Sequence, residues 1–391
     1  MNEKKAVFTI DILKNIINVY FDTFFVMYFF KVANYEVLPL AKYYLTFYFF
    51  ISIGFFIIRN FMKRNVKVPY FRMGISLQAL YISLIMLLKE DIINHIFLIG
   101  FIKGMADGFY HFPKNILNTE KVTNEDRKTF NGIINIINKI MNIIIPLCMG
   151  VALTFISYIN LGKVFFSLFV IMFIVSFFLK DEKYCVKSFQ FKNFMNLIKK
   201  NKKVRHSLAV PFLAGFTYSS GVMGTIITLS KINIFKTNLN LGFVDSLCAF
   251  LSLIICTLYT IKVKKERYSS LLHISSVISF FTLILFAFYP KVWVLITYLI
   301  VRFSFILTIN LISDNVIVNL SNCKELKENF KPEYYFTREV LFTISRCFGY
   351  SMLLLMCLFL GKEYINYLMI IPAVSLLLEG IIVARLSKVQ E

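Results

Sequence analysis

Cysteine and histidine are scarce in this sequence, and they lie in no pattern that binds a metal ion. The seven cysteines and four histidines contain no C-x-x-C pair and no metal-like spacing between the two residue types. Several cysteines lie inside apolar runs, where cysteine behaves as a small hydrophobic residue. We therefore expect no disulfide bond, no metal site and no cofactor.

The sequence also lacks a recognisable set of nucleophile, base and orienting residue, which enzymes need. The candidates for acid–base chemistry are Asp107 with His111, one helical turn apart, and His206 in a hydrophilic segment. We interpret His111 as an ordinary polar residue at a helix end. A membrane-embedded acyl- or glycosyl-transferase is the less favoured alternative, and we expect no enzyme activity.

Long hydrophilic segments are almost absent, since residues 180–206 form the only one. The 391 residues are 58% hydrophobic with a mean hydropathy of +0.69, whereas a soluble domain would be more polar. The 43 basic residues outnumber the 22 acidic ones, but they cluster at the ends of apolar runs. This placement favours a membrane protein over a nucleic-acid-binding protein.

About twelve apolar runs are long enough to cross a bilayer, and helix is the state that bonds every amide within its own segment. The first run lacks a small-residue cleavage site, so we expect a membrane helix rather than a signal peptide. The predicted spans are 11–31, 38–58, 71–88, 92–112, 130–155, 161–179, 207–229, 240–261, 269–289, 292–316, 336–360 and 364–385.

Loop charges predict the orientation of these spans. The basic residues gather in alternate connections, most densely in 180–206, so we expect those connections and both termini in the cytoplasm. The predicted organisation is an N-terminal six-helix bundle (1–179), a basic cytoplasmic linker (180–206) and a C-terminal six-helix bundle (207–391). In the linker, Phe191, Phe194, Met195 and Ile198 recur at helical spacing, which fits an amphipathic helix on the inner leaflet or a solvated linker.

Three predicted spans carry polar residues along one helix face. These residues are Asp11, Asn15, Asn18 and Asp22 in the first span, Asn131, Asn135, Asn138, Lys139 and Asn142 in the fifth, and Glu339, Thr343, Arg346 and Tyr350 in the eleventh. A polar stripe at this depth lines a water-filled cavity or packs against another helix. We favour the lining of a shared aqueous cavity, because a charge at the bilayer centre costs about 2.5–3.5 kcal/mol. The third run of each half, by contrast, is nearly free of polar groups.

The fourth span holds Lys103 and Asp107, one turn apart, which form an internal ion pair, a substrate or proton site, or both. In the tenth span, Arg302 lies near the midplane, at a level close to that of Arg346. Two cations there would attract an anionic group, or they pair with Glu339 or Asp314. The residues predicted to line the cavity or bind the substrate are Asn18, Lys103, Asn138, Lys139, Asn142, Arg302, Arg346 and Tyr350.

Asp22 is the preferred candidate for a proton carrier, with Asp107 as the second. Asp22 has no basic residue within one turn, whereas Lys103 lies one turn from Asp107. Asp314 and Glu379 lie near the cytoplasmic ends of their predicted helices, so we interpret them as gate or surface groups. Gly100, Gly104 and Gly108 form a small-residue ridge, which predicts close packing against a neighbouring helix.

With six plus six predicted helices, both termini inside and a basic central loop, the chain resembles the major facilitator superfamily over essentially its whole length. That family carries a glycine, an aspartate–arginine pair and further basic residues between its second and third helices. Here Gly54 is followed by Arg59, Lys63 and Arg64, while Ile58 and Phe61 replace the acidic residue and the second glycine. The resemblance implies a cytoplasmic gate or latch, for which the candidates are Gly54, Arg59, Lys63, Arg64, Asp314 and Glu339.

The fifth predicted span resembles that of the family's drug antiporters, which usually ends in a glycine-rich segment around a proline. Pro146 and Gly150 are kept here, while Asn142 and Ile145 stand where glycine is usual. Proline kinks a helix because it lacks an amide donor. The fourth span is also similar to that of proton-coupled members, with Lys103 upstream of Gly108 in place of an arginine.

The resemblance implies a monomeric, multi-pass transporter in the lipid bilayer, working by alternating access. Its substrate would be a small amphipathic or anionic compound, exported in exchange for protons. A non-transporting sensor or assembly factor on the same fold is the main alternative. The excess of isoleucine, asparagine, lysine and phenylalanine is typical of AT-rich bacterial genomes, which places the protein in a bacterial plasma membrane.

Overall fold

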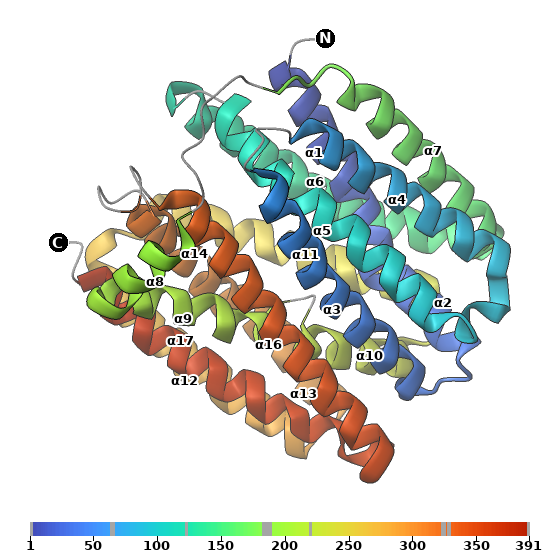
Figure 1. The fold of residues 1–391 in the computed structure, drawn as a ribbon. Helices are drawn as coiled ribbons and strands as arrows, with labels where there is room; N and C mark the ends of the chain where they lie inside the picture. Colours follow the sequence, from blue (N-terminus) through green and yellow to red (C-terminus); the bar gives the residue numbers. More distant parts are fainter. Residues whose placement is uncertain are drawn as a thin grey trace. The chain divides into compact units, whose positions relative to one another are not determined.

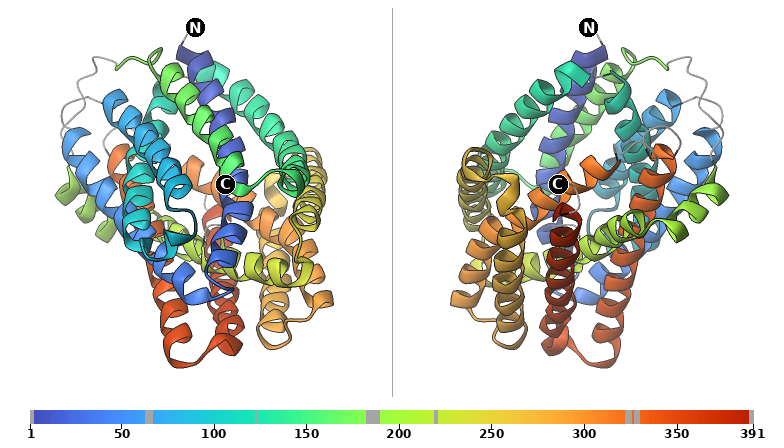
Figure 2. Two further views of the ribbon diagram at one scale, coloured as in Figure 1. Left: turned by 90° about the vertical axis from the view of Figure 1, so that its right-hand side faces the viewer. Right: turned by 90° about the vertical axis from the view of Figure 1, so that its left-hand side faces the viewer.

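The computed structural model describes residues 3–62, 67–121, 124–181, 190–218, 221–321, 326 and 330–388. These residues form helices and their connections, as Figures 1 and 2 show. The helices gather into two compact units, one comprising Met1–Ser188 with Phe235–Leu247 and the other Phe189–Ile234 with Cys248–Glu391. The predicted domain boundaries at residues 179 and 206 remain predictions.

Unit 1 is built on helices that follow the first six predicted spans. They are α1 (Glu3–Val19), η1 (Tyr20–Phe25), α2 (Val26–Val32), α3 (Val37–Met62), α4 (Val68–Leu88), η2 (Lys89–Ile93), α5 (Ile96–Lys121), α6 (Asn124–Phe155) and α7 (Tyr158–Ser176). α5 packs between α3 and α4, and α1 packs on α6 and α7 (Figure 1). The first residues of α11 (Asn238–Lys262) also belong to this unit.

Unit 2 holds α8 (Phe191–Lys200), α9 (Lys202–Thr217), α10 (Val222–Phe235), the rest of α11, η3 (Lys265–Arg267), α12 (Tyr268–Phe288), α13 (Val292–Val301), η4 (Arg302–Ile306), α14 (Leu307–Ser321), α16 (Lys331–Phe359), η5 (Lys362–Met369) and α17 (Ile370–Lys388). In this unit α17, the dark red helix in Figure 2, packs on α12 and α9.

Ten helices among the described residues are long and apolar enough to cross a membrane, against about twelve expected spans. The first and fourth predicted spans are not among the ten, although both are helical. These two segments carry buried charged residues, namely Asp11 and Lys14 in α1 and Lys103 and Asp107 in α5. The crossing of the bilayer by both segments, and the cytoplasmic termini, remain predictions.

The seventh predicted span, 207–229, lies within a candidate membrane span at Lys202–Phe235, but two helices rather than one form it. α9 ends at Thr217 and α10 begins at Val222. Pro211 lies inside α9, and Tyr218, which follows its last residue, has an extended backbone. Two further spans contain short π-helical segments, at Tyr20–Phe25 and Arg302–Ile306. Such an insertion rotates the residues after it on the helix surface and is frequent at functional sites.

The amphipathic helix expected in the linker exists as α8. Phe194 on its apolar face is fully buried, with its ring centroid 6.0 Å from that of Phe330, which directly precedes α16. The carboxylate of Glu333 accepts a hydrogen bond from the amide of Gln190 at 2.7 Å, at the start of α8. The helix is therefore held against the beginning of α16.

The glycine ridge of α5 packs closely against α3, as predicted. A Cβ on Gly104 would lie 2.5 Å from the carbonyl oxygen of Phe47, and one on Gly108 would lie 3.0 Å from the Cα of Gly54. Gly54 was expected to belong to a latch, and its backbone is instead in direct contact with this ridge. The two helices approach closely because neither carries a side chain at this contact.

Gly104→Ala should therefore lower the thermal stability of the purified protein, because its methyl group has to displace backbone atoms of α3. Overpacking of this kind costs about 1–3 kcal/mol. Gly162→Ala in α7 is the control, since its Cβ would meet only the flexible side chain of Met86, at 3.1 Å. Equal melting temperatures for the two variants would show that the contact between α3 and α5 is not as tight as the structure has it.

Candidate functional site

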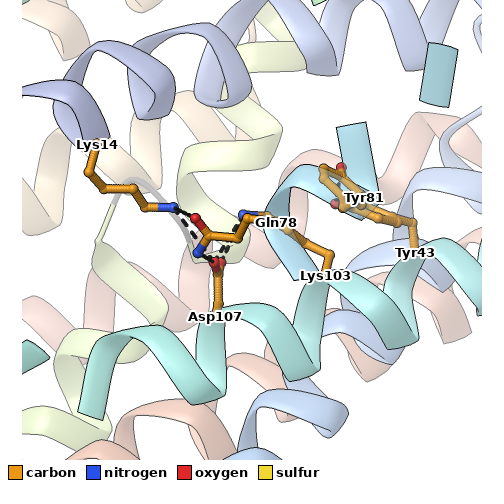
Figure 3. A network of polar contacts seen from close by, with 6 residues as sticks. All are labelled: Lys14, Tyr43, Gln78, Tyr81, Lys103 and Asp107. Carbon is orange, nitrogen blue, oxygen red and sulfur yellow. Dashed lines mark hydrogen bonds and ion pairs between the residues drawn. The ribbon is translucent and has the colours of Figure 1, made fainter. Parts of the chain in front are cut away.

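Four buried polar residues meet inside unit 1, on three different helices (Figure 3). The ammonium of Lys103 lies 3.0 Å from one carboxylate oxygen of Asp107, one turn along α5. Gln78 of α4 donates to the other oxygen of Asp107 at 2.7 Å, and its own amide oxygen accepts from Lys14 of α1 at 3.0 Å. The ammonium of Lys14 is also 3.7 Å from Asp107. We call Lys14, Gln78, Lys103 and Asp107 the polar network.

Local sequence explains how the network forms. Lys103 and Asp107 are four residues apart, which places them on the same face of α5. α4 is otherwise apolar toward α5, so Gln78 is fully buried there. Lys14 lies on the face of α1 that also buries Ile10 and Ile17. Each long side chain reaches inward from an apolar face, and their polar ends meet at Asp107.

Aromatic rings enclose the network. The ammonium of Lys14 lies 4.9 Å from the ring centre of Tyr110, and that of Lys103 lies 5.2 Å from Phe21. Beside them the hydroxyls of Tyr43 and Tyr81 are 2.7 Å apart (Figure 3). The faces of aromatic rings attract cations, so these rings provide part of the solvation that the two ammonium groups lose on burial.

The basic groups of the network outnumber its single acid. Two buried lysine amines share the carboxylate of Asp107, so within these four residues one positive charge is in excess when both lysines are protonated. A neighbouring pair is balanced, since Asp11 of α1 forms an ion pair with Lys114 of α5. The polar network is therefore the part of unit 1 that could attract an anionic group.

The polar stripe predicted in the first span divides in the structure. Asp11 is buried in its ion pair, while Asn15 is half-buried and donates to the amide oxygen of Asn142 at 3.2 Å. Asn18 is half-buried, and Asp22 is exposed in η1. Next to Asp22, the hydroxyl of Thr23 donates to the carboxylate of Asp245 at 2.8 Å. Asn15 and Asn142 thus follow the packing alternative, and Asp22 stays accessible.

The stripe of the fifth span is described in part. The side chains of Asn131 and Asn135 lie outside the described residues, while Asn138 and Lys139 are half-buried. Further along α6, Pro146 and Gly150 lie against the start of α11. A Cβ on Gly150 would be 2.8 Å from the carbonyl oxygen of Asn238. The kink residues therefore lie at a close contact between two helices.

Each of the residues predicted in the second half has a close neighbour in unit 2. Arg302 begins η4 and lies 5.7 Å from the ring of Phe303, and Arg346 lies 3.9 Å from the ring of Phe342. Tyr350 is fully buried, and its hydroxyl is 2.6 Å from that of Thr225. This bond joins α10 and α16, and the role of Tyr350 in a cavity stays a prediction.

Among the predicted gate residues, Asp314 pairs with Arg338 at 3.8 Å, rather than with Arg302 or Arg346. Glu339 is half-buried in α16. Arg59 lies 5.8 Å from the ring of Phe56. The loop residues Lys63 and Arg64 fall outside the described residues.

A contact that the sequence did not suggest joins the start of α4 to the end of α7. Arg72 donates to the carbonyl oxygens of Ser176 and Leu179, both at 3.1 Å, and lies over the ring of Phe177. The carboxylate of Asp181 accepts from the amides of Lys67 and Val68. Pairing across more than a hundred residues leaves no local pattern in the sequence.

Comparison with known proteins identifies the class. The family model of the Major Facilitator Superfamily matches residues 19–322, so the chain belongs to this family. It is a membrane transporter fold rather than an enzyme. An uncharacterized protein of Bacillus subtilis strain 168, YqgE, is 27% identical over 163 residues, which cover 41% of this chain and 38% of that relative.

Two solved structures show the same fold over nearly all of both chains. The nucleoside transporter NupG has a TM-score of 0.68 at 14% identity and covers 99% of each chain. A bacterial homologue of the iron transporter ferroportin, in an inward-facing state, has a TM-score of 0.63 at 14% identity and covers 98% of each. At this identity the likeness concerns the fold.

Proposed function

We propose that this protein is a proton-coupled secondary transporter that exports a small amphipathic or anionic compound by alternating access. The main support for this proposal is the polar network of unit 1, in which two buried lysines share one carboxylate. A charge at bilayer depth is costly, so a side chain that only packs would be expected to be apolar or balanced. The excess positive charge supports an anionic group as the substrate.

In this proposal Asp22 carries the proton and Asp107 does not. Three donors surround Asp107, two of them ammonium groups, and all of them stabilise its carboxylate. Asp22 is exposed within η1, a segment whose other side chains at Tyr20, Phe21 and Thr23 are buried. A carboxylate that can be reached from water can take up and release a proton during a cycle.

The test is proton movement in vesicles reconstituted with the purified protein. After a pH jump, a fluorescent pH indicator reports proton flux with each member of a panel of lipophilic cations and organic anions. Wild-type protein should couple proton movement to at least one organic anion. If no compound moves protons, the protein acts as a non-transporting sensor or assembly factor, and the transport proposal fails.

Asp22→Asn should reduce the pH-driven flux by more than about tenfold, equivalent to about 1.4 kcal/mol in the barrier, because the amide cannot carry a proton. Asp91→Asn, which alters an exposed carboxylate in η2, is the control and should keep the wild-type flux. A fully active Asp22→Asn variant would remove Asp22 from the mechanism.

A further inference from the structure

The carboxylate of Glu379 is buried in the interior of unit 2. This residue lies in α17 and has 1% of its surface exposed. The sequence predicted a gate or surface group here; the burial of Glu379 rules out the surface alternative, and a gate role stays a prediction. α12 and α9 both pack on α17, so the helix has neighbours on several sides, and Glu379 faces them rather than water.

One hydrogen bond reaches this carboxylate. The hydroxyl of Ser313, itself buried in α14, donates to Oε1 at 2.9 Å. The second oxygen, Oε2, is buried and has no hydrogen-bond partner among the described residues. No described lysine or arginine forms an ion pair with Glu379, in contrast to the carboxylate of Asp107 in unit 1.

The helix that carries Glu379 packs closely on α12. A Cβ on the adjacent Gly380 would lie 2.6 Å from the Cβ and 2.7 Å from the hydroxyl oxygen of Ser276 in α12. That hydroxyl donates to the carbonyl oxygen of His273 within its own helix. Close packing of α12 on α17 therefore encloses the carboxylate on this side.

The charged groups nearby do not compensate a negative charge at Glu379. Asp314 acts on it electrostatically with the same sign, and its partner is Arg338 of α16. Tyr218, at the end of α9, also faces this group. Of the remaining ionisable side chains described on the packed elements, Tyr268 of α12 is half-buried. The others are exposed: Lys202, Lys203, Arg205 and His206 of α9, His273 of α12, Glu363, Tyr364 and Tyr367 of η5, and Arg385 and Lys388 of α17.

An ionised carboxylate that is buried without a cation is far less stable than its neutral form. We propose that Glu379 is a proton-binding site in unit 2, where the proton is held on Oε2 while Ser313 donates to Oε1. The proton leaves when movement of α17 against α12 and α14 admits water to the carboxyl group. This site goes beyond the proposed role of Asp22, since it lies in the other unit and does not depend on that role.

The test is infrared spectroscopy of the purified full-length protein, which needs no transported substrate. A protonated carboxyl group has a C=O stretching band that a carboxylate lacks. At neutral pH, the difference between wild type and Glu379→Gln should contain one such band, and the band should disappear when the pH is raised. Glu363→Gln, which changes an exposed carboxylate in η5, should leave the band in place.

The hydrogen bond of Ser313 gives a second, independent signature. Ser313→Ala removes the donor to Oε1, so the carboxyl band should remain but shift to higher frequency. Glutamine resembles the neutral acid in shape, so the Glu379→Gln variant should fold.

Three outcomes would overturn the proposal. The band could be missing from wild-type protein at neutral pH, which would make Glu379 ionised. It could persist at every pH at which the protein stays folded, which would make it a fixed structural acid. It could disappear on replacing choline chloride with sodium chloride, which would make the site one for sodium ions.

Discussion

Asp107→Asn is expected to destabilise the protein by about 3–5 kcal/mol, because the variant leaves two buried ammonium groups without a carboxylate. Lys14 and Lys103 lie 3.7 Å and 3.0 Å from Asp107 and are themselves buried. An asparagine could still accept one hydrogen bond but would carry no charge. The measurement is thermal unfolding of the purified protein in detergent, monitored as the fraction of protein that remains monodisperse.

A triple mutant separates the effect of charge from that of shape in the loss of stability. Combining Asp107→Asn with Lys14→Met and Lys103→Met removes all three charges, so most of the lost stability should return. Asp91→Asn, in the exposed η2 turn, is the control and should change stability by less than about 0.5 kcal/mol. An Asp107→Asn variant as stable as wild type would show that the lysines do not depend on this carboxylate.

Much of the fold could be predicted from the sequence because a lipid environment restricts the possible backbone structures so strongly. The membrane-length helices among the described residues follow the predicted spans, since long apolar runs in hydrocarbon have to satisfy their amides internally. The exceptions are local. The break between Thr217 and Val222 interrupts an apolar run without a charge, and the π-helical turns at Tyr20 and Arg302 have no signature in hydropathy.

The candidate site was only half predictable. The pair Lys103 and Asp107 lies within one helix, so its spacing of four residues is visible in the sequence. Lys14 and Gln78 join this pair from other helices, and their separation of 64 positions leaves no local signal of contact in the sequence. The one indication for Gln78 in the sequence is that it is a polar residue in the middle of the otherwise apolar third span. Pairing between helices depends on their rotation, and hydrophobic periodicity fixes that rotation only roughly.

Two buried carboxyl groups, one in each unit, differ in the side chains that surround them, and composition does not reveal this difference. Asp107 and Glu379 are both nearly inaccessible, yet the first has two ammonium neighbours and the second has a single serine hydroxyl. A carboxylic acid is therefore held charged in one unit and, by our inference, neutral in the other. The direction of the difference comes from the neighbouring side chains, of which Lys14 and Ser313 lie far away in sequence.

Lys14→Met should separate stability from transport. The replacement leaves Lys103 and Asp107 as a neutral pair and removes the excess positive charge. Gln78 loses the donor to its amide oxygen, which lowers stability, while removal of the excess charge raises it. Because the two effects partly offset each other, the free energy of unfolding should change by less than about 1.5 kcal/mol. In reconstituted vesicles, flux of the organic anions that wild type carries should fall by more than about tenfold.

Lys14→Arg is the matched variant, because it keeps the charge and should retain anion flux even if its larger head packs less well against Tyr110. Since Asp107→Asn removes a negative charge and Lys14→Met a positive one, the two replacements change the network in opposite directions. A loss of stability in the first and a loss of anion flux in the second would assign the carboxylate to folding and the unbalanced ammonium to substrate attraction. If Lys14→Met keeps the anion flux of wild type, the excess charge has no part in recognition, and the buried lysine would serve only to connect α1 with α4 and α5.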